Sequence, residues 1–116
     1  MPQVVFAPAA IRDLQRLRDF LRPKNPDAAH RAGEAIRLGV QVLSRHPQRG
    51  RLVEDLPESY REWPIDFGDT GYVARYRIAG DVVTILAVRH QKEADFSWPS
   101  AKNEISTQVK NSVLSA

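Results

Sequence analysis

The amino-acid sequence predicts an α+β domain: a short N-terminal strand, a hairpin of two helices, and a three-stranded antiparallel meander in one sheet. Apolar residues recur at helical spacing over residues 8–45 and alternate with other residues over residues 60–78. Short turn signals, GDTG and AGD, join the later segments, and such short connections allow only antiparallel neighbours. We therefore expect both helices to pack on one face of the sheet.

The composition indicates a globular protein of the cytoplasm. The chain has 116 residues, of which 42% are hydrophobic and 27% charged, which suits one folded domain. It has no cysteine, which excludes disulfides and fits a reducing compartment. We expect neither a signal peptide nor a membrane-spanning segment. The net charge of +3 favours an acidic protein or a nucleic acid as partner.

Two helices are expected after a β-prone stretch at residues 3–6. Pro8 opens the first helix and Pro23 ends it. Its apolar stripe consists of Ile11, Leu14, Leu17 and Leu21. Asn25 has the side chain of an N-cap, so we expect the second helix to begin there and to run to about Arg45.

A loop over residues 48–58 and three strands are expected next. The first strand, residues 60–67, has Trp63, Ile65 and Phe67 on one face, and Pro64 within it suggests a sheet edge or a bulge. In the second strand one face is apolar and the other carries two arginines. The apolar face consists of Tyr72, Ala74, Tyr76 and Ile78, and the opposite face of Val73, Arg75 and Arg77.

The last strand, residues 82–90, is apolar at nearly every position, which predicts cover on both faces. The remaining segment, residues 97–116, begins at a Trp-Pro breaker and becomes polar. Its apolar residues Ile105, Val109 and Val113 are four apart, which is compatible with a C-terminal helix. We therefore divide the chain into a domain over residues 1–96 and a C-terminal extension over residues 97–116.

Five short stretches follow one another in order after the second helix. They are PQRG (47–50), YRE (60–62), GY followed by YR (71–77), GD (80–81) and RHQK (89–92). Taken with the order of strand and helices before them, they resemble the RelE/ParE superfamily of bacterial toxins from type II toxin–antitoxin modules. The resemblance spans about residues 3–96.

This resemblance implies two different activities. RelE-like members are ribosome-dependent ribonucleases that cut messenger RNA, whereas ParE-like members inhibit DNA gyrase and cleave no RNA. Both kinds are held in a hetero-oligomer by a cognate antitoxin, which is often acidic and of the ribbon-helix-helix type, and we expect no cofactor or metal. A third alternative is a degenerate toxin that only binds its antitoxin as a co-repressor.

Cleavage of RNA through the 2′-hydroxyl requires a base, an acid and cations that stabilise the charged transition state. The resemblance implies that a nuclease has an arginine after the GY pair and often a tyrosine after the last strand. This chain has Val73 and Phe96 at those positions. The catalytic set of a nuclease would then be His90, Arg61 and Arg77, and the two departures favour the ParE-like activity.

The residues that bind the target are expected on the open face of the sheet and at the end of the last strand. They are Arg75, Arg77, Arg89, His90, Lys92 and Phe96. Arg61 is expected to join Arg75 and Arg77 if the strands pair in a register that matches their faces. Charge reversal at Arg75 or Arg77 is expected to leave stability within about 1 kcal/mol if these side chains lie at the surface. A collapse of stability would instead indicate structural arginines.

Overall fold

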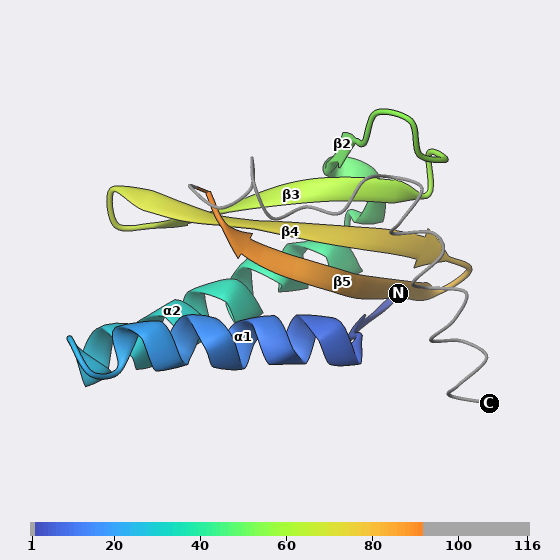
Figure 1. Ribbon diagram of the computed structural model, residues 1–116. Coiled ribbons are helices and arrows are strands. Elements are labelled where there is room, and N and C mark those ends of the chain that lie inside the picture. Colours follow the sequence, from blue (N-terminus) through green and yellow to red (C-terminus); the bar gives the residue numbers. More distant parts are fainter. Residues whose placement is uncertain (1, 92–116) are drawn as a thin grey trace.

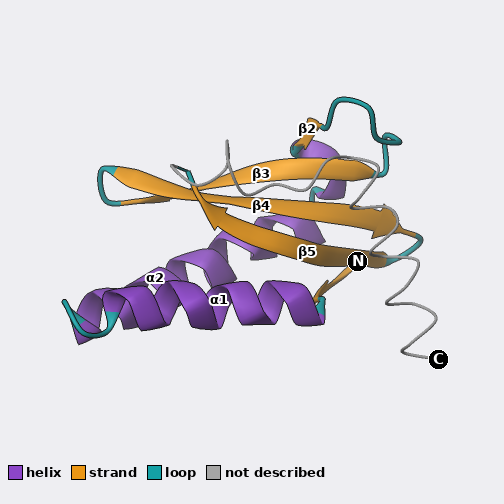
Figure 2. Ribbon diagram, viewed as in Figure 1, coloured by secondary structure: helices purple, strands orange, loops and turns teal. Residues whose placement is uncertain are grey.

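A computed structural model of the protein describes residues 2–91 and confirms the predicted fold class (Figure 1). The helices and strands are β1 (Gln3–Phe6), α1 (Pro8–Leu21), α2 (Pro26–Gln41), β2 (Arg51–Leu52), β3 (Tyr60–Phe67), β4 (Thr70–Ala79) and β5 (Val82–His90). The expected C-terminal helix over residues 97–116 lies outside the described residues. Figure 2 shows two layers, with α1 and α2 on one face of the sheet.

The five strands form one mixed sheet in the order β1-β5-β4-β3-β2. The predicted meander β3-β4-β5 is antiparallel, and β1 pairs in parallel with β5. The prediction of a loop over residues 48–58 was wrong in part, because this segment contains the short strand β2. In it, Arg51 pairs with Glu62 and Leu52 pairs with Arg61. Two residues are too few to show an alternating pattern, so the sequence could not reveal this strand.

Local signals position the two helices. Pro8 occupies the first turn of α1, and the side chain of Asn25 accepts a hydrogen bond from Ala28 N at 3.1 Å, as an N-cap does. Helix α2 ends at Gln41, and a 3-10 turn over Val42–Ser44 continues it almost to the expected end. Neither helix has the length and apolar character needed to cross a membrane.

The core lies between the helices and the sheet. Its most deeply buried side chains are Ile36, Val40, Leu43, Tyr76, Val83, Ile85 and Val88. The apolar face predicted for β4 is confirmed, because Tyr72, Ala74 and Tyr76 are all buried in this core. Trp63 donates from Nε1 to the Gly39 carbonyl at 3.0 Å, which fastens β3 to α2.

A β-bulge changes the direction of the side chains along β5. The register shifts at Arg75 and Tyr76 of β4, so that Tyr76 lies opposite Ile85 and Arg75 opposite Ala87. Because a bulge adds one residue to one strand, the side chains of β5 exchange faces after it. Val88 and His90 therefore point toward the helices, and no local pattern in β5 reveals this change of face.

Candidate functional site

The register of β3 and β4 separates the candidate arginines. Arg61 lies opposite Tyr76, and Arg75 lies opposite Glu62. Residues that oppose each other share a face of the sheet, so Arg61 is on the side of the helices and Arg75 is on the other side. The register that would bring Arg61 to the face of Arg75 and Arg77 does not occur. Alternation along β3 already indicates the face of Arg61, because Arg61 and the core residue Ile65 are four residues apart and therefore lie on the same face of the strand.

Arg61 has structural contacts. Its Nη1 donates to the backbone carbonyls of Gln48 at 2.8 Å and Gly50 at 2.9 Å. The Tyr76 hydroxyl lies at the same loop, where it donates to the Pro47 carbonyl at 2.6 Å and accepts from Gly50 N at 2.9 Å. Burial raises the pKa of the Tyr76 phenol, against the effects of the Gly50 hydrogen bond and the Arg61 charge. Together these contacts fix the loop to the sheet.

Arg75 is buried on the face away from the helices. It is 6% exposed and contacts Glu62 Oε2 with Nη2 at 2.7 Å and with Nε at 3.1 Å. Glu62 is 9% exposed and also contacts Arg51 Nη2 at 3.1 Å. The expectation that charge reversal at Arg75 is neutral for stability therefore loses its premise, because this side chain does not lie at the surface.

Glu62 is a residue that sequence reasoning missed. A signal for it existed, because Trp63 and Ile65 were predicted to share one face of β3, so Glu62 had to lie on the opposite one. That is the face of Arg75 and Arg77. A carboxylate among arginines on one face of a sheet predicts an ion pair across neighbouring strands.

Arg77 is the arginine of this face that has no acidic partner among residues 2–91. It lies opposite Tyr60 and is half-buried. Its Nε is buried, and no hydrogen-bond acceptor for it occurs in the described part of the chain. A buried donor without an acceptor costs free energy, so Arg77 is the candidate cation for a ligand on this face.

The end of β5 does not form one basic surface. Arg89 Nη1 donates to Asp13 Oδ2 of α1 at 2.6 Å, and the same oxygen accepts from Val88 N at 2.9 Å. His90 Nε2 lies 3.0 Å from Thr70 Oγ1 on the side of the helices. Lys92 and Phe96, which were also expected to bind the target, lie outside the described residues.

The catalytic set expected of a nuclease is not assembled. Arg61 and His90 lie on the side of the sheet that faces the helices, and Arg77 lies on the other. General acid–base catalysis requires its groups within hydrogen-bonding reach of one reacting centre. Within residues 2–91, no three side chains of His, Asp or Glu are placed to hold a metal ion.

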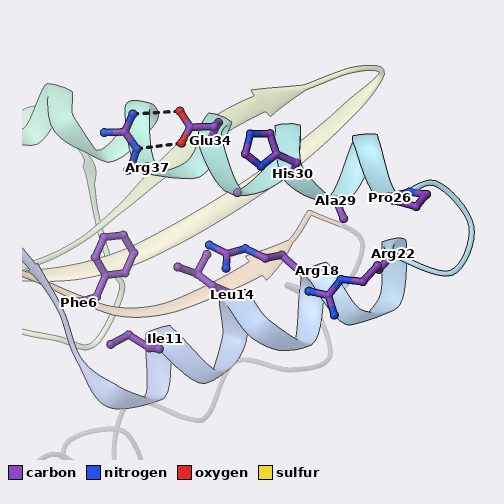
Figure 3. A pocket seen from close by; sticks show the side chains of 11 residues that line it. Phe6, Ile11, Leu14, Arg18, Arg22, Pro26, Ala29, His30, Glu34 and Arg37 are labelled. Atoms are coloured by element: carbon purple, nitrogen blue, oxygen red, sulfur yellow. Dashed lines mark hydrogen bonds and ion pairs between the residues drawn. The ribbon is translucent and has the colours of Figure 1, made fainter.

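A groove lies between the two helices (Figure 3). Its cavity has a volume of about 650 Å³, and its lining includes the apolar side chains of Phe6, Ile11 and Leu14. The polar residues of the lining are Arg18, Arg22, His30, Glu34 and Arg37. We call this cavity the interhelical groove. It combines an apolar floor with a mostly basic border.

Two ion pairs already occupy part of this border. Arg37 contacts Glu34 at 3.0 Å, and Arg22 contacts Asp19 at 2.8 Å. The contact with Glu34 raises the pKa of Arg37 and lowers that of Glu34. Arg18, by contrast, has no ion pair with an acidic residue among residues 2–91. It is half-buried, and its cationic head is available to an acidic ligand.

Arg18 reaches across to α2 over Gly33. A Cβ atom added at Gly33 would lie 2.9 Å from Arg18 Nε and 3.2 Å from its Nη2. Those distances are below van der Waals contact, so only glycine leaves Arg18 in this position. The pairing of a small residue on α2 with a long cation on α1 shapes the floor of the interhelical groove.

Comparison with known protein families gives one match over most of the chain. The family described as "ParE toxin of type II toxin-antitoxin system, parDE" matches residues 4–95. Among solved structures, this fold is similar to "Chromosomal ParDE TA system from P. aeruginosa", with a TM-score of 0.63 and 21% sequence identity. That similarity covers 78% of this chain and 96% of the other and concerns the fold alone.

Similar curated proteins occur in Caulobacter vibrioides. The chain is 38% identical to "Toxin RelE3" over 93 residues, which are 80% of this chain and 98% of the relative. It is 36% identical to "Toxin RelE1" over 90 residues, which are 78% of this chain and 94% of that relative. This chain therefore covers nearly the full length of both relatives.

Proposed function

Since the chain belongs to the ParE toxin family of type II toxin–antitoxin systems, we propose that it arrests growth by inhibiting DNA gyrase. We further propose that a cognate acidic antitoxin neutralises it in a hetero-oligomeric complex. Both events would take place in the cytoplasm, where gyrase and DNA are found. The names of the similar proteins include both RelE and ParDE, so these names do not distinguish gyrase from messenger RNA as the target.

The observation that carries the choice of gyrase is the separation of Arg61 and His90 from Arg77 by the thickness of the sheet. A phosphodiester bound at Arg77 could not reach His90 on the other face. Arg61 is further engaged by two backbone carbonyls. Valine at position 73 also leaves no cation where the resemblance implies one in nucleases. Binding without chemistry is the use that these side chains support best.

Arg77 offers the first test of this proposal. Arg77→Glu should abolish growth arrest and gyrase inhibition, because it reverses the one charge of the open face that no described acid balances. The free energy of unfolding should change little, because the variant removes a buried Nε donor for which residues 2–91 provide no acceptor. The assays are supercoiling by purified gyrase at micromolar toxin and growth after induction. Messenger RNA on ribosomes should remain intact.

Arg45→Glu is the matched control, since Arg45 is exposed just after α2 and should keep full toxicity. Cuts in ribosome-bound messenger RNA that disappear with His90→Ala would show the RelE-like ribonuclease instead. Soluble, folded wild-type protein that leaves growth unchanged would show the degenerate toxin that only binds its antitoxin.

The interhelical groove is the surface that best suits the antitoxin. Its apolar floor can receive the apolar side of a partner segment that folds on binding. Arg18 can pair with a carboxylate of that segment without breaking an ion pair within residues 2–91. An acidic amphipathic segment satisfies both features at once.

Gly33→Ala tests this assignment with one methyl group. The added Cβ should displace Arg18, because it would lie 2.9 Å from Nε. Loss of a charged hydrogen bond of about 1.5–3 kcal/mol should weaken antitoxin binding about ten- to hundredfold. Stability should not fall, because alanine is favoured over glycine in a helix by about 1 kcal/mol. Titration calorimetry with the antitoxin and urea unfolding measure the two effects.

A double-mutant cycle with Arg18→Ala provides the control. If Gly33→Ala acts through Arg18, it should have no further effect on antitoxin affinity in the Arg18→Ala background. Equal antitoxin affinities for the wild type and Gly33→Ala would place the antitoxin on another surface.

A further inference from the structure

We propose that a small cavity at the edge of β3 binds a phosphate of the DNA backbone, so that the toxin contacts DNA when it acts on gyrase. The cavity has a volume of about 290 Å³ and is lined by Arg49, Arg51, Glu62, Trp63, Pro64 and Val73. We call it the β3-edge cavity, because β2 pairs only with Arg61 and Glu62 and leaves the rest of β3 at the edge of the sheet. The inference rests on the proposed function and adds a nucleic acid to the partners of the open face.

The loop that carries Arg49 is fixed to the sheet by buried polar groups. Arg61 Nη1 and the Tyr76 hydroxyl donate to three backbone carbonyls of residues 47–50. The same hydroxyl accepts a hydrogen bond from Gly50 N at 2.9 Å. The side chain of Arg49 is nevertheless exposed. A cation on a fixed backbone loses less conformational entropy when it binds a ligand, so this loop is suited to present Arg49.

Trp63 positions the guanidinium of Arg49. Arg49 Cζ lies 5.9 Å from the centre of the Trp63 ring, and the ring is held by the hydrogen bond from its Nε1 to the Gly39 carbonyl. A cation–π contact leaves the five N–H donors of a guanidinium unused. The Arg49 side chain makes no hydrogen bond or ion pair within residues 2–91. Its donors are therefore available to a phosphate, whose geometry matches the guanidinium fork.

Arg51 places a second cation at the same cavity. Its Nη2 lies 3.1 Å from Glu62 Oε1, but its side chain is 76% exposed. The other oxygen of Glu62 lies 2.7 Å from Nη2 of the buried Arg75. Because exposed ion pairs are weak, the head of Arg51 can turn to an anion while Glu62 keeps its contact with Arg75. In the described part of the chain, Glu62 is the one acidic residue of the lining.

Arg77 extends this positive charge across the face away from the helices. Arg51 lies opposite Glu62, and Arg77 lies opposite Tyr60. The two arginines are thus two strands and two residues apart, which is about 10 Å across the strands and about 7 Å along them. A single small anion cannot contact cations at this spacing. A DNA strand can, because its phosphates repeat along the backbone.

The edge of β3 favours a nucleic acid over an added protein strand. Beyond Glu62, no described strand pairs with the outer side of β3. Pro64 lies in this stretch, and a proline of an edge strand turns outward the side that has no N–H group. A strand added there would lack part of its hydrogen bonds, whereas a phosphate backbone needs only the arginine side chains. Such contacts do not depend on the base sequence.

The salt dependence of DNA binding tests this inference. Fluorescence anisotropy of a labelled DNA duplex with the full-length toxin should give a slope of log K against log salt of about −2.7, from three phosphate contacts. Arg49→Ala should reduce this slope by about one and weaken binding at every salt concentration. Arg49→Lys should keep the slope and bind more weakly than the wild type, because lysine lacks the planar fork.

Arg45→Ala is the matched control for Arg49→Ala. Arg45 is also exposed and loses the same charge, but it does not line the β3-edge cavity. Its slope should match that of the wild type, and all variants should melt with the wild type and bind antitoxin equally. In supercoiling assays, Arg49→Ala should inhibit gyrase less than Arg45→Ala does.

Other outcomes would overturn the inference. Equal salt slopes for the wild type and Arg49→Ala would show that the β3-edge cavity binds no phosphate. Polyglutamate that displaces DNA at equal charge concentration would assign the cavity to an acidic protein segment, and tighter binding of single-stranded RNA would assign it to RNA. The anisotropy measurements contain no gyrase. DNA binding through Arg49 by a toxin that leaves gyrase active would therefore refute only the proposed target, and gyrase inhibition without DNA binding would refute only the cavity.

Discussion

Glu62→Ala should lower the free energy of unfolding by about 3–5 kcal/mol, the usual effect of removing one partner of a buried ion pair. The side chains of Arg75 and Glu62 are only 8% and 11% exposed, and two nitrogens of Arg75 contact Glu62 Oε2. Loss of the carboxylate leaves this buried guanidinium without its Glu62 contacts. Urea unfolding followed by circular dichroism measures the change.

Two variants make this expectation specific. Glu34→Ala removes a carboxylate from an exposed pair with Arg37, whose side chains are 46% and 55% exposed, and should leave the stability nearly unchanged. The double variant Glu62→Met/Arg75→Leu removes both charges and should recover most of the stability. An equally small effect of Glu62→Ala and Glu34→Ala would mean that other groups balance Arg75.

Gly50→Ala should destabilise the protein by about 2–5 kcal/mol, the sum expected for overpacking and for broken buried hydrogen bonds. An added Cβ would lie 2.5 Å from the Tyr76 hydroxyl and 2.7 Å from the Glu62 carbonyl oxygen. The backbone of Gly50, with φ −67° and ψ 158°, is open to any residue. The cost therefore arises from crowding, which must displace the loop from β3 and β4.

Gly68→Ala is the informative comparison for Gly50→Ala. Gly68 has a φ of +61° and open space around an added Cβ. Alanine there should therefore lower the free energy of unfolding only by the cost of a left-handed backbone conformation, about 1–2 kcal/mol. In a Tyr76→Phe background, where the crowded hydroxyl is absent, Gly50→Ala should cost less than in the wild type. If its cost is unchanged, the clash with the Glu62 carbonyl dominates.

Much of the site could be predicted from alternation along single strands. Trp63 and Ile65 identify the core face of β3, so the placement of Arg61 beside the helices and of Glu62 opposite them follows from parity. Tyr72 and Tyr76 identify the core face of β4 in the same way. Arg61 shares the face of the core residue Ile65, whereas Arg75 and Arg77 lie on the face of β4 opposite to the core residue Tyr76.

The sequence by itself determined the two helices, the three-stranded meander, the core faces of β3 and β4, and the family. These features depend on residues that are neighbours in the chain, through helical and strand periodicity, proline positions and turn signals. Each such signal is repeated several times within one element, so single exceptions such as Pro64 do not hide it.

Only the tertiary structure decided what happens at the end of β5 and between the helices. The bulge opposite Arg75 turns His90 toward the helices, and Arg89 binds Asp13, which is 76 residues away along the chain. The parallel pairing of β1 with β5 and the crossing of Arg18 over Gly33 are equally non-local. The physical reason is that the alternation within a strand determines only which of its own side chains share a face. Register, bulges and side-chain partners are set by hydrogen bonds and packing between elements distant in sequence.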